Sequence, residues 1–212
     1  MSTPVFRRRF VAQSHRGGAR PLIVPPSVTF DPAAGKTGAG LLLTNGNQTV
    51  ESTNGTWKSS YSTVTRTGKL YVEGVWNVDG GGSVAAIGFA DASLSAENPI
   101  GQDGGAKKSF GYSVNSIIRY NDGVGGVLAG YSVGNTIGVA CDFTLSPPQV
   151  WADINGTWQG VGDPSAGAGI VLTGWLGTGP YHGAMSVNGD KWTENFNASG
   201  FKPAGYTTMS GN

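Results

Sequence analysis

Glycine is the feature of this sequence that most limits what it can fold into. It occupies 36 of the 212 positions, about 17% against roughly 7% in ordinary proteins. A glycine inside a helix costs roughly 1 kcal/mol relative to alanine. After residue 30, no window of about 12 residues free of glycine and proline repeats apolar residues with helical spacing. Because the glycines follow no Gly-X-Y period, collagen is excluded as well. The sequence therefore predicts an all-β chain rich in turns.

Turn residues divide the chain after residue 27 at intervals of about 8–12 residues, which is typical of a sandwich or a barrel. Residues 69–76 alternate apolar and polar side chains, whereas residues 84–90 and 136–143 are nearly continuous apolar runs that indicate buried strands. Asn155-Gly156 is a strong hairpin signal. We count roughly ten to twelve strands, too many for one open antiparallel sheet. Residues 28–212 are therefore predicted to form an antiparallel two-sheet β-sandwich.

The content of reactive side chains argues against metal and disulfide chemistry. The chain has two histidines, His15 and His182, and one cysteine, Cys141. A single cysteine excludes an intrachain disulfide framework, and no group of His, Cys and Asp has the spacing of a zinc site. No apolar run reaches the roughly 18 residues of a membrane-spanning helix. We expect no cofactor, no metal and no insertion into a membrane.

The first 27 residues form a segment of distinct character. Residues 1–30 contain five arginines and no acidic residue. Since the whole chain carries +1, residues 31–212 carry −4. Residues 7–10 (R-R-R-F) resemble the start of a twin-arginine export signal. The apolar stretch that such a signal requires is missing from residues 11–18, so no signal peptide is expected.

Two interpretations of this basic arm stay open, a disordered tail and an anchor that becomes ordered on a partner. Prolines flank Leu22-Ile23-Val24 and favour extended backbone. An extended apolar tripeptide suits docking in a groove or addition to a sheet edge. Direct binding of nucleic acid is not expected, because no base-stacking module accompanies the arginines. The residues expected to anchor the arm are Arg7, Arg8, Arg9, Phe10, Arg16, Arg20, Leu22, Ile23 and Val24.

Motifs that suggest catalysis are weak. Residues 130–134 match G-x-S-x-G around Ser132, but a β-branched run follows instead of the helix that a hydrolase needs. Gly35-Lys36-Thr37 lacks the earlier glycine of a P-loop, since that position is Phe30. Carboxylates that might form a glycosidase pair lie close to glycine, where aspartate normally makes turns: Asp103, Asp122, Asp153 and Asp163. No catalytic residue is expected, and an esterase or glycosidase is a third alternative.

Six segments, taken in order, resemble the landmarks of a SPRY domain. They are residues 68–73 (G-K-L-Y-V-E), 86–90 (A-I-G-F-A), 110–112 (F-G-Y) with 120–123 (Y-N-D-G), 133–142 (V-G-N-T-I-G-V-A-C-D), 153–160 (D-I-N-G-T-W-Q-G), and 193–196 (T-E-N-F) with Phe201. The sequence departs from the family at Asn135, at Asn197 and in residues 144–148 (T-L-S-P-P), where a tight turn is usual. The resemblance implies a bent, jelly-roll-like β-sandwich whose loops at one edge bind protein or glycan without catalysis.

A narrower likeness concerns the start of the domain. Residues 28–32 (V-T-F-D-P) and 40–47 (G-L-L-L-T-N-G-N) are similar to the W-D-P … L-S-N-G-N lead-in of SPRY proteins from bacteriophage genomes. This implies a virion accessory protein, made in the host cytoplasm and carried on a capsid, portal, collar or tail, in multiple copies or as a homo-oligomer. The alternative is an adhesion module that recognises a host surface glycan or protein.

Aromatic side chains near turns are the candidates for the binding surface, because exposed rings stack on sugars and anchor interfaces. Trp76, Trp151 and Trp192 fall inside expected strands and are assigned to the core. Trp57, Trp158 and Trp175 lie near turns, and the resemblance implies that Tyr112, Tyr120 and Tyr131 belong to the segments that lead to the family's binding loops. The candidate loop surface comprises Trp57, Tyr112, Arg119, Tyr120, Tyr131, Trp158 and Trp175.

Overall fold

The computed structural model describes residues 27–53, 55, 57–81, 85–160, 162–196 and 200–211. All nine residues predicted to anchor the arm lie outside this range: Arg7, Arg8, Arg9, Phe10, Arg16, Arg20, Leu22, Ile23 and Val24. Their anchoring role stays a prediction.

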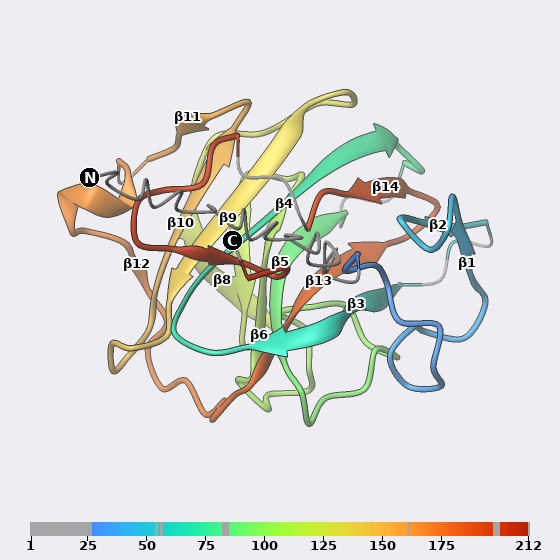
Figure 1. Cartoon of the computed structure of the whole chain (residues 1–212), viewed down its shortest axis with the longest axis horizontal. Helices are drawn as coiled ribbons and strands as arrows, with labels where there is room; N and C mark the ends of the chain where they lie inside the picture. Colours follow the sequence, from blue (N-terminus) through green and yellow to red (C-terminus); the bar gives the residue numbers. More distant parts are fainter. Residues whose placement is uncertain are drawn as a thin grey trace, which may run out of the picture.

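The described residues form two β-sheets (Figure 1). The nine-stranded sheet has the order β1 (Leu41–Thr44), β2 (Thr49–Ser52), β14 (Lys191–Glu194), β4 (Lys69–Val78), β9 (Thr136–Asp142), β10 (Gln149–Ile154) and β11 (Thr157–Trp158), with β12 (Ile170–Val171) beside β10 and β15 (Thr207–Thr208) beside β4. The six-stranded sheet has the order β3 (Lys58–Arg66), β13 (Tyr181–Val187), β5 (Ala86–Asp91), β6 (Ser109–Ser113), β7 (Ile117–Tyr120) and β8 (Gly123–Val127). A 3-10 turn, η1 (Pro164–Ala166), lies before β12. All named strand pairs are antiparallel except β15 with β4. The predicted antiparallel two-sheet sandwich is confirmed.

The main core lies between the two sheets. On β4 the alternation predicted from the sequence holds, since Leu70, Val72 and Trp76 belong to the main buried cluster while Tyr71 belongs to another. Ile87 of β5 contributes to the main cluster from the opposite sheet. Period-two alternation is the expected pattern of a strand with one face in a core.

Strands β5 and β9 lack alternation because both of their faces are covered. The outer face of β5 packs under the β5–β6 connection, where Ala86 and Ala90 form a second buried cluster with Ile100. Gly111 makes room for this layer, because a β-carbon there would lie 2.7 Å from Cδ1 of Ile100. The outer face of β9 packs Ala140 against Tyr206 of the C-terminal segment.

Strand β3 was not predicted, because its sequence is rich in serine and threonine. Its buried hydroxyls are nevertheless hydrogen-bonded. The Oγ atoms of Ser59 and Ser186 lie 2.8 Å apart, and Ser62 Oγ donates to the carbonyl of Val64. Buried polar groups with partners carry little penalty, so a polar strand is tolerated inside the sheet.

Two long connections meet at one end of the sandwich. The β9–β10 loop comprises residues 143–148 and the β12–β13 loop comprises residues 172–180. Figure 1 shows β9 and β10 side by side in the nine-stranded sheet, with β12 alongside. In the part of the chain that the structure describes, no helix is long and apolar enough to cross a membrane.

Candidate binding site

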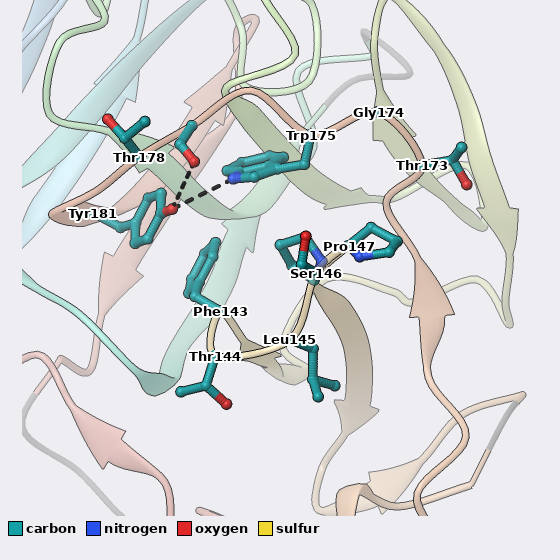
Figure 2. Close-up of a pocket in the computed structure, with 12 residues that line it drawn as sticks. Phe143, Thr144, Leu145, Ser146, Pro147, Thr173, Gly174, Trp175, Thr178 and Tyr181 are labelled. Carbon is teal, nitrogen blue, oxygen red and sulfur yellow. Dashed lines mark hydrogen bonds between the residues drawn. The ribbon is translucent and has the colours of Figure 1, made fainter.

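A pocket of about 510 Å³ opens between the β9–β10 loop and the β12–β13 loop (Figure 2). We call it the loop pocket. Its lining contains no acidic or basic side chain and comprises Phe143, Thr144, Leu145, Ser146, Pro147, Pro148, Thr173, Gly174, Trp175, Gly177, Thr178 and Tyr181. An uncharged lining of rings and hydroxyls suits a neutral ligand or the apolar part of a protein partner.

Three aromatic rings form one wall of the loop pocket. Phe143 stacks on Tyr181 with ring centroids 3.7 Å apart and an interplanar angle of 12°. Trp175 lies 5.8 Å from Phe143 and 5.9 Å from Tyr181, centroid to centroid. The Tyr181 hydroxyl donates to the Gly177 carbonyl at 3.1 Å and accepts from the Trp175 indole at 3.4 Å. Figure 2 marks both contacts with dashed lines from Tyr181. These contacts hold the rings in one arrangement before any ligand binds.

The β12–β13 loop is held in place by a carboxylate at the end of β5. Asp91 Oδ2 accepts hydrogen bonds from the backbone amides of Thr178 and Gly179, each at 2.9 Å. Its Oδ1 accepts from the amide and hydroxyl of Ser93. Burial by itself would raise the pKa of Asp91, but the hydrogen bonds from Ser93, Gly179 and Thr178 outweigh it and lower the pKa. The carboxylate is therefore ionised at neutral pH and fixes one wall of the pocket.

A second carboxylate holds the opposite wall. Asp142, the last residue of β9, accepts hydrogen bonds from the amide of Thr144 at 3.0 Å and from its hydroxyl at 2.5 Å. Its Oδ2 lies 3.0 Å from Nζ of Lys69. Burial opposes ionisation here too, and the bonds from Thr144 and Lys69 lower the pKa of Asp142 in spite of it. Both pocket loops are thus tied to strand ends by ionised aspartates.

An apolar edge adjoins the loop pocket. A shallower hollow of about 320 Å³ contains Val124 of β8 and Val171 of β12, and it shares Thr173 with the loop pocket. Val124 is 62% exposed and Val127 is 72% exposed. We call Val124, Val127 and Val171 the valine edge. Exposed apolar side chains gathered beside a pocket are typical of an interaction surface.

Three residues of the predicted loop surface belong to the core instead. Tyr112, Tyr120 and Tyr131 are 0%, 7% and 5% exposed. Their hydroxyls donate to backbone carbonyls, Tyr112 to Ala129 and Tyr131 to Ala85 at 2.9 Å. The hydroxyl of Tyr120 donates to the carbonyl of Thr173 at 3.2 Å. A tyrosine with a partner for its hydroxyl can be buried at little cost, so the rings of Tyr112 and Tyr131 are not available to a ligand. Tyr120 is nearly buried but belongs to the lining of the shallower hollow.

The other four predicted residues do not form one surface. Trp175 lines the loop pocket. Trp57 and Arg119 lie together elsewhere, with the Arg119 guanidinium carbon 5.9 Å from the centre of the Trp57 ring. Trp158 makes an edge contact with Tyr71, 6.4 Å between centroids. The sequence analysis missed Phe143 and Tyr181 as pocket residues. The signal that could have pointed to this site is the T-L-S-P-P interruption at residues 144–148, which the sequence analysis noted only as a departure from the family and which forms one wall.

The catalytic alternatives find no support in the geometry of their residues. His182 Nδ1 lies 2.7 Å from the carbonyl of Ser62, and its ring stacks on Tyr61. The amide of Ser132 is bonded in a turn to Asn135. The aspartates also serve the backbone: Asp103 accepts from the amides of Lys107, Lys108 and Ser109, Asp122 from Gly104, Asp153 from Gly156 and Asp163 from Ser165. Among the described residues, no group of three or more His, Cys, Asp or Glu side chains is arranged to hold a metal ion.

A buried polar cluster lies on the outer face of the nine-stranded sheet. The Tyr71 hydroxyl lies 3.0 Å from Asp153 Oδ2 and 3.1 Å from Glu73 Oε2. The pKa of Asp153 is raised to about 6, and burial is the largest cause of this shift. Asp153 is 0% exposed and Glu73 is 3% exposed. A β-carbon at Gly138 would lie 2.0 Å from Asp153 Oδ2, so the space for this cluster depends on that glycine. The carboxylates of Asp153 and Glu73 are covered by protein, so they are not positioned to contact a sugar.

Comparison with solved structures identifies the fold. A human SPRY domain superposes with a TM-score of 0.52 and 15% identity over 76% of this chain and 97% of that chain. The SPRY domain of human HERC1 gives a TM-score of 0.53 and 15% identity over 80% of this chain and 99% of that chain. The stonustoxin structure gives 0.55 and 16% over 80% of this chain, which corresponds to 28% of the stonustoxin chain. No protein-family model and no curated protein matches the sequence. The domain therefore has a SPRY-like β-sandwich fold.

Proposed function

We propose that this protein is an accessory component of a bacteriophage particle, in which residues 1–27 anchor the chain and the SPRY-like domain is displayed as a binding module. Its partners on the particle would be capsid, portal, collar or tail proteins. The five arginines of the arm, with no acidic residue in residues 1–30, support the anchoring role, because clustered positive charge attracts an acidic surface on a partner. The lead-in at residues 28–32 and 40–47 supports the phage setting through its likeness to SPRY proteins of phage genomes.

The observation that carries the binding role is the loop pocket beside the valine edge. Phe143, Trp175 and Tyr181 contact one another, and Asp142 and Asp91 fix the two loops that carry Phe143 and Trp175. A surface that is already ordered loses little conformational entropy when a partner binds. Display of many copies on a particle would add avidity to a modest single-site affinity.

Particle association tests the anchoring role. Particles assembled with the full chain, with a variant lacking residues 1–27, and with R7S/R8S/R9S are compared by quantitative mass spectrometry. We expect both altered chains to be lost from the particles. K107S/K108S, which removes positive charge from the domain and leaves the arm intact, is the control and should be retained. Undiminished incorporation of the shortened chain, or absence of the unaltered chain from particles, would overturn the proposal.

A second function, recognition of a neutral host glycan, is favoured by the lining of the loop pocket. Exposed hydroxyls of Ser146, Thr173 and Thr178 surround the half-buried ring of Trp175. Sugars are bound by such combinations of a ring face and hydrogen-bonding groups. Saturation-transfer NMR of the full chain against a panel of neutral oligosaccharides tests this. Binding should be lost in T178V and kept in W158F, and a panel without any binder at millimolar concentration contradicts it.

A further inference from the structure

The two edges of the six-stranded sheet differ in how they are covered. At one edge, β3 is covered by residues 29–37, where the Thr63 amide donates to the Thr29 carbonyl at 2.7 Å and the Asp31 amide donates to the Tyr61 carbonyl at 2.8 Å. At the other edge is β8, which within the described residues has a strand partner on one side only, β7. Open edges offer unpaired backbone groups to another strand.

Strand β8 lacks the usual protection of an exposed edge. Its sequence, G-V-G-G-V, contains no proline and no charged residue. Lysine, proline and inward charges are the devices that normally prevent an edge from pairing with another chain. Instead, Val124 and Val127 are mostly exposed, and Val171 of β12 lies beside the same hollow. Among the described residues, the edge therefore combines backbone groups that have no strand partner with an apolar surface, which is the chemistry that receives an added β-strand.

One apolar segment outside the described residues has the character of a strand that could pair with the β8 edge. Leu22-Ile23-Val24 consists of β-favouring apolar residues between Pro21 and Pro25. The prolines set the limits of a strand three residues long and favour extended backbone. The segment also belongs to the arm of net charge +5, whereas residues 31–212 carry −4, so the arm and the domain surface attract each other.

The segment cannot reach the open edge of its own subunit. Thr29 lies outside β3, at the opposite edge of the sheet. A strand added beyond β8 would lie seven strand spacings away, about 34 Å at roughly 4.8 Å each. From Thr29 back to Leu22 is seven residues, which span at most about 25 Å when fully extended, and the strand would have to begin closer still. A second copy of the chain must therefore supply the edge.

We propose that Leu22-Ile23-Val24 of one copy adds as a strand to β8 of a second copy and packs on the valine edge. This deepens the proposed function and rests on it in one respect, namely that the arm is an anchor. In this arrangement the apolar part of the arm contacts a second copy of the chain. Arg7, Arg8, Arg9 and Arg16 remain available to contact other particle proteins. Since the donor segment and the acceptor edge are different surfaces, the contact is heterologous and produces a ring, an open chain or a reciprocal exchange between two copies.

Sedimentation velocity of the full chain tests the exchange over a range of concentrations. The unaltered protein is expected to form dimers or larger species. L22S/I23S/V24S removes the donor and V124S/V127S removes the apolar side chains of the acceptor, and each should sediment as a monomer. Val78, half-exposed at the end of β4, provides the matched control, and V78S should associate like the unaltered chain.

A peptide titration locates the contact. Isotope-labelled L22S/I23S/V24S protein is titrated with a synthetic peptide of residues 18–27, followed by backbone NMR. The largest shifts are expected at residues 123–127 and 170–171, and a peptide with the same three serine substitutions should cause none. A monomeric unaltered chain, unchanged association of both variants, or peptide shifts confined to residues 143–148 would overturn the inference. R7S/R8S/R9S separates the two proposals, because it should leave association intact while abolishing incorporation into particles.

Discussion

The carboxylate of Asp91 binds the backbone amide of Thr178 across 87 positions of sequence, with Oδ2 2.9 Å from the nitrogen. This contact joins the end of β5 to the loop that carries Trp175 and forms one wall of the loop pocket. The same oxygen accepts from Gly179. The conformation of the loop thus depends on one buried acceptor at the end of β5, the strand that pairs with β13 in the six-stranded sheet.

Replacing this acceptor should loosen the pocket. In D91N, an NH2 group replaces one of the two carboxylate oxygens. Either the backbone amides of Thr178 and Gly179 or the backbone amide of Ser93 then lose their acceptor. Unsatisfied buried donors cost about 1–3 kcal/mol each, and we expect the free energy of unfolding to fall by roughly that amount. Urea unfolding measures the change. D163N, at the exposed cap of η1, is the control and should be close to neutral. Equal stability of D91N and the unaltered protein would contradict this account of the loop.

The hydroxyl of Tyr181 should determine the order of the aromatic wall. It donates to the Gly177 carbonyl and accepts from the Trp175 indole. Y181F keeps the stack on Phe143 but removes both hydrogen bonds, which should cost about 1 kcal/mol of stability and free the Trp175 ring. Acrylamide quenching of tryptophan fluorescence should increase in Y181F. Y206F, whose ring contacts Trp151 outside the pocket, should leave the quenching unchanged.

Gly111 tests how the outer layer packs on the six-stranded sheet. In G111A the new β-carbon would meet Cδ1 and Cγ1 of Ile100, both at 2.7 Å. Overpacking of this kind typically costs about 1–3 kcal/mol. The double variant G111A/I100V removes one of the two contacts and should recover part of the loss, as a chemical-denaturation cycle of the four proteins will measure. Ala at Gly200, where a β-carbon meets nothing within 4 Å, should be tolerated. A destabilisation that I100V does not relieve would place the cause elsewhere.

Strands whose sequence carries a hydrophobic pattern were predictable. Residues 69–76, 84–90 and 136–143 were expected as strands and correspond to β4, β5 and β9. Their side chains either alternate or are continuously apolar because of what covers each face, so local sequence reports the environment directly. Strand β3 lacked this signal, since its stability comes from hydroxyl partners on β13 and in the β5–β6 loop that lie far away in sequence.

The candidate site was less predictable because it depends on contacts between distant loops. Trp175 was selected as an exposed aromatic residue, and it does line the pocket. Tyr112 and Tyr131 were selected because their segments resemble those that lead to the binding loops of SPRY domains, but backbone carbonyls of Ala129 and Ala85 allow their burial. Which carbonyl lies near a given hydroxyl is a property of the tertiary structure. The same holds for Asp91, whose role follows only from its position opposite Thr178.

Because Asp91 and Asp142 stabilise the fold in their ionised form, we expect the protein to lose stability in acid. The pKa values of Asp91 and Asp142 are lowered in the folded protein from an ordinary value of 3.8, since hydrogen bonds to the carboxylates outweigh the effect of burial. Their stabilisation is complete above about pH 4 and is lost as the pH falls through the lowered pKa values. Chemical denaturation between pH 2 and pH 5 should show a falling free energy of unfolding, and D142N should reduce the slope.

For Glu194 we expect the opposite trend: the free energy of unfolding should fall as the pH rises from acid to neutral. Its side chain is buried on β14, Oε1 has no hydrogen-bond partner among the described residues, and burial raises its pKa from 4.5 to about 7. The folded protein therefore retains a proton that the unfolded chain releases above about pH 4.5, so stability declines as the pH rises from that value to about 7. At about 1.36 kcal/mol per pKa unit, the decline attributable to this group is on the order of 3 kcal/mol. E194Q keeps an acceptor for the amide of Phe196 and cannot ionise. It should match the unaltered protein near pH 4 and exceed its stability at pH 8, whereas E97Q, at an exposed carboxylate paired with Lys58, should show no such gain. Parallel stability curves for E194Q and the unaltered protein from pH 4 to pH 8 would show that Glu194 is ionised in the folded state despite its burial.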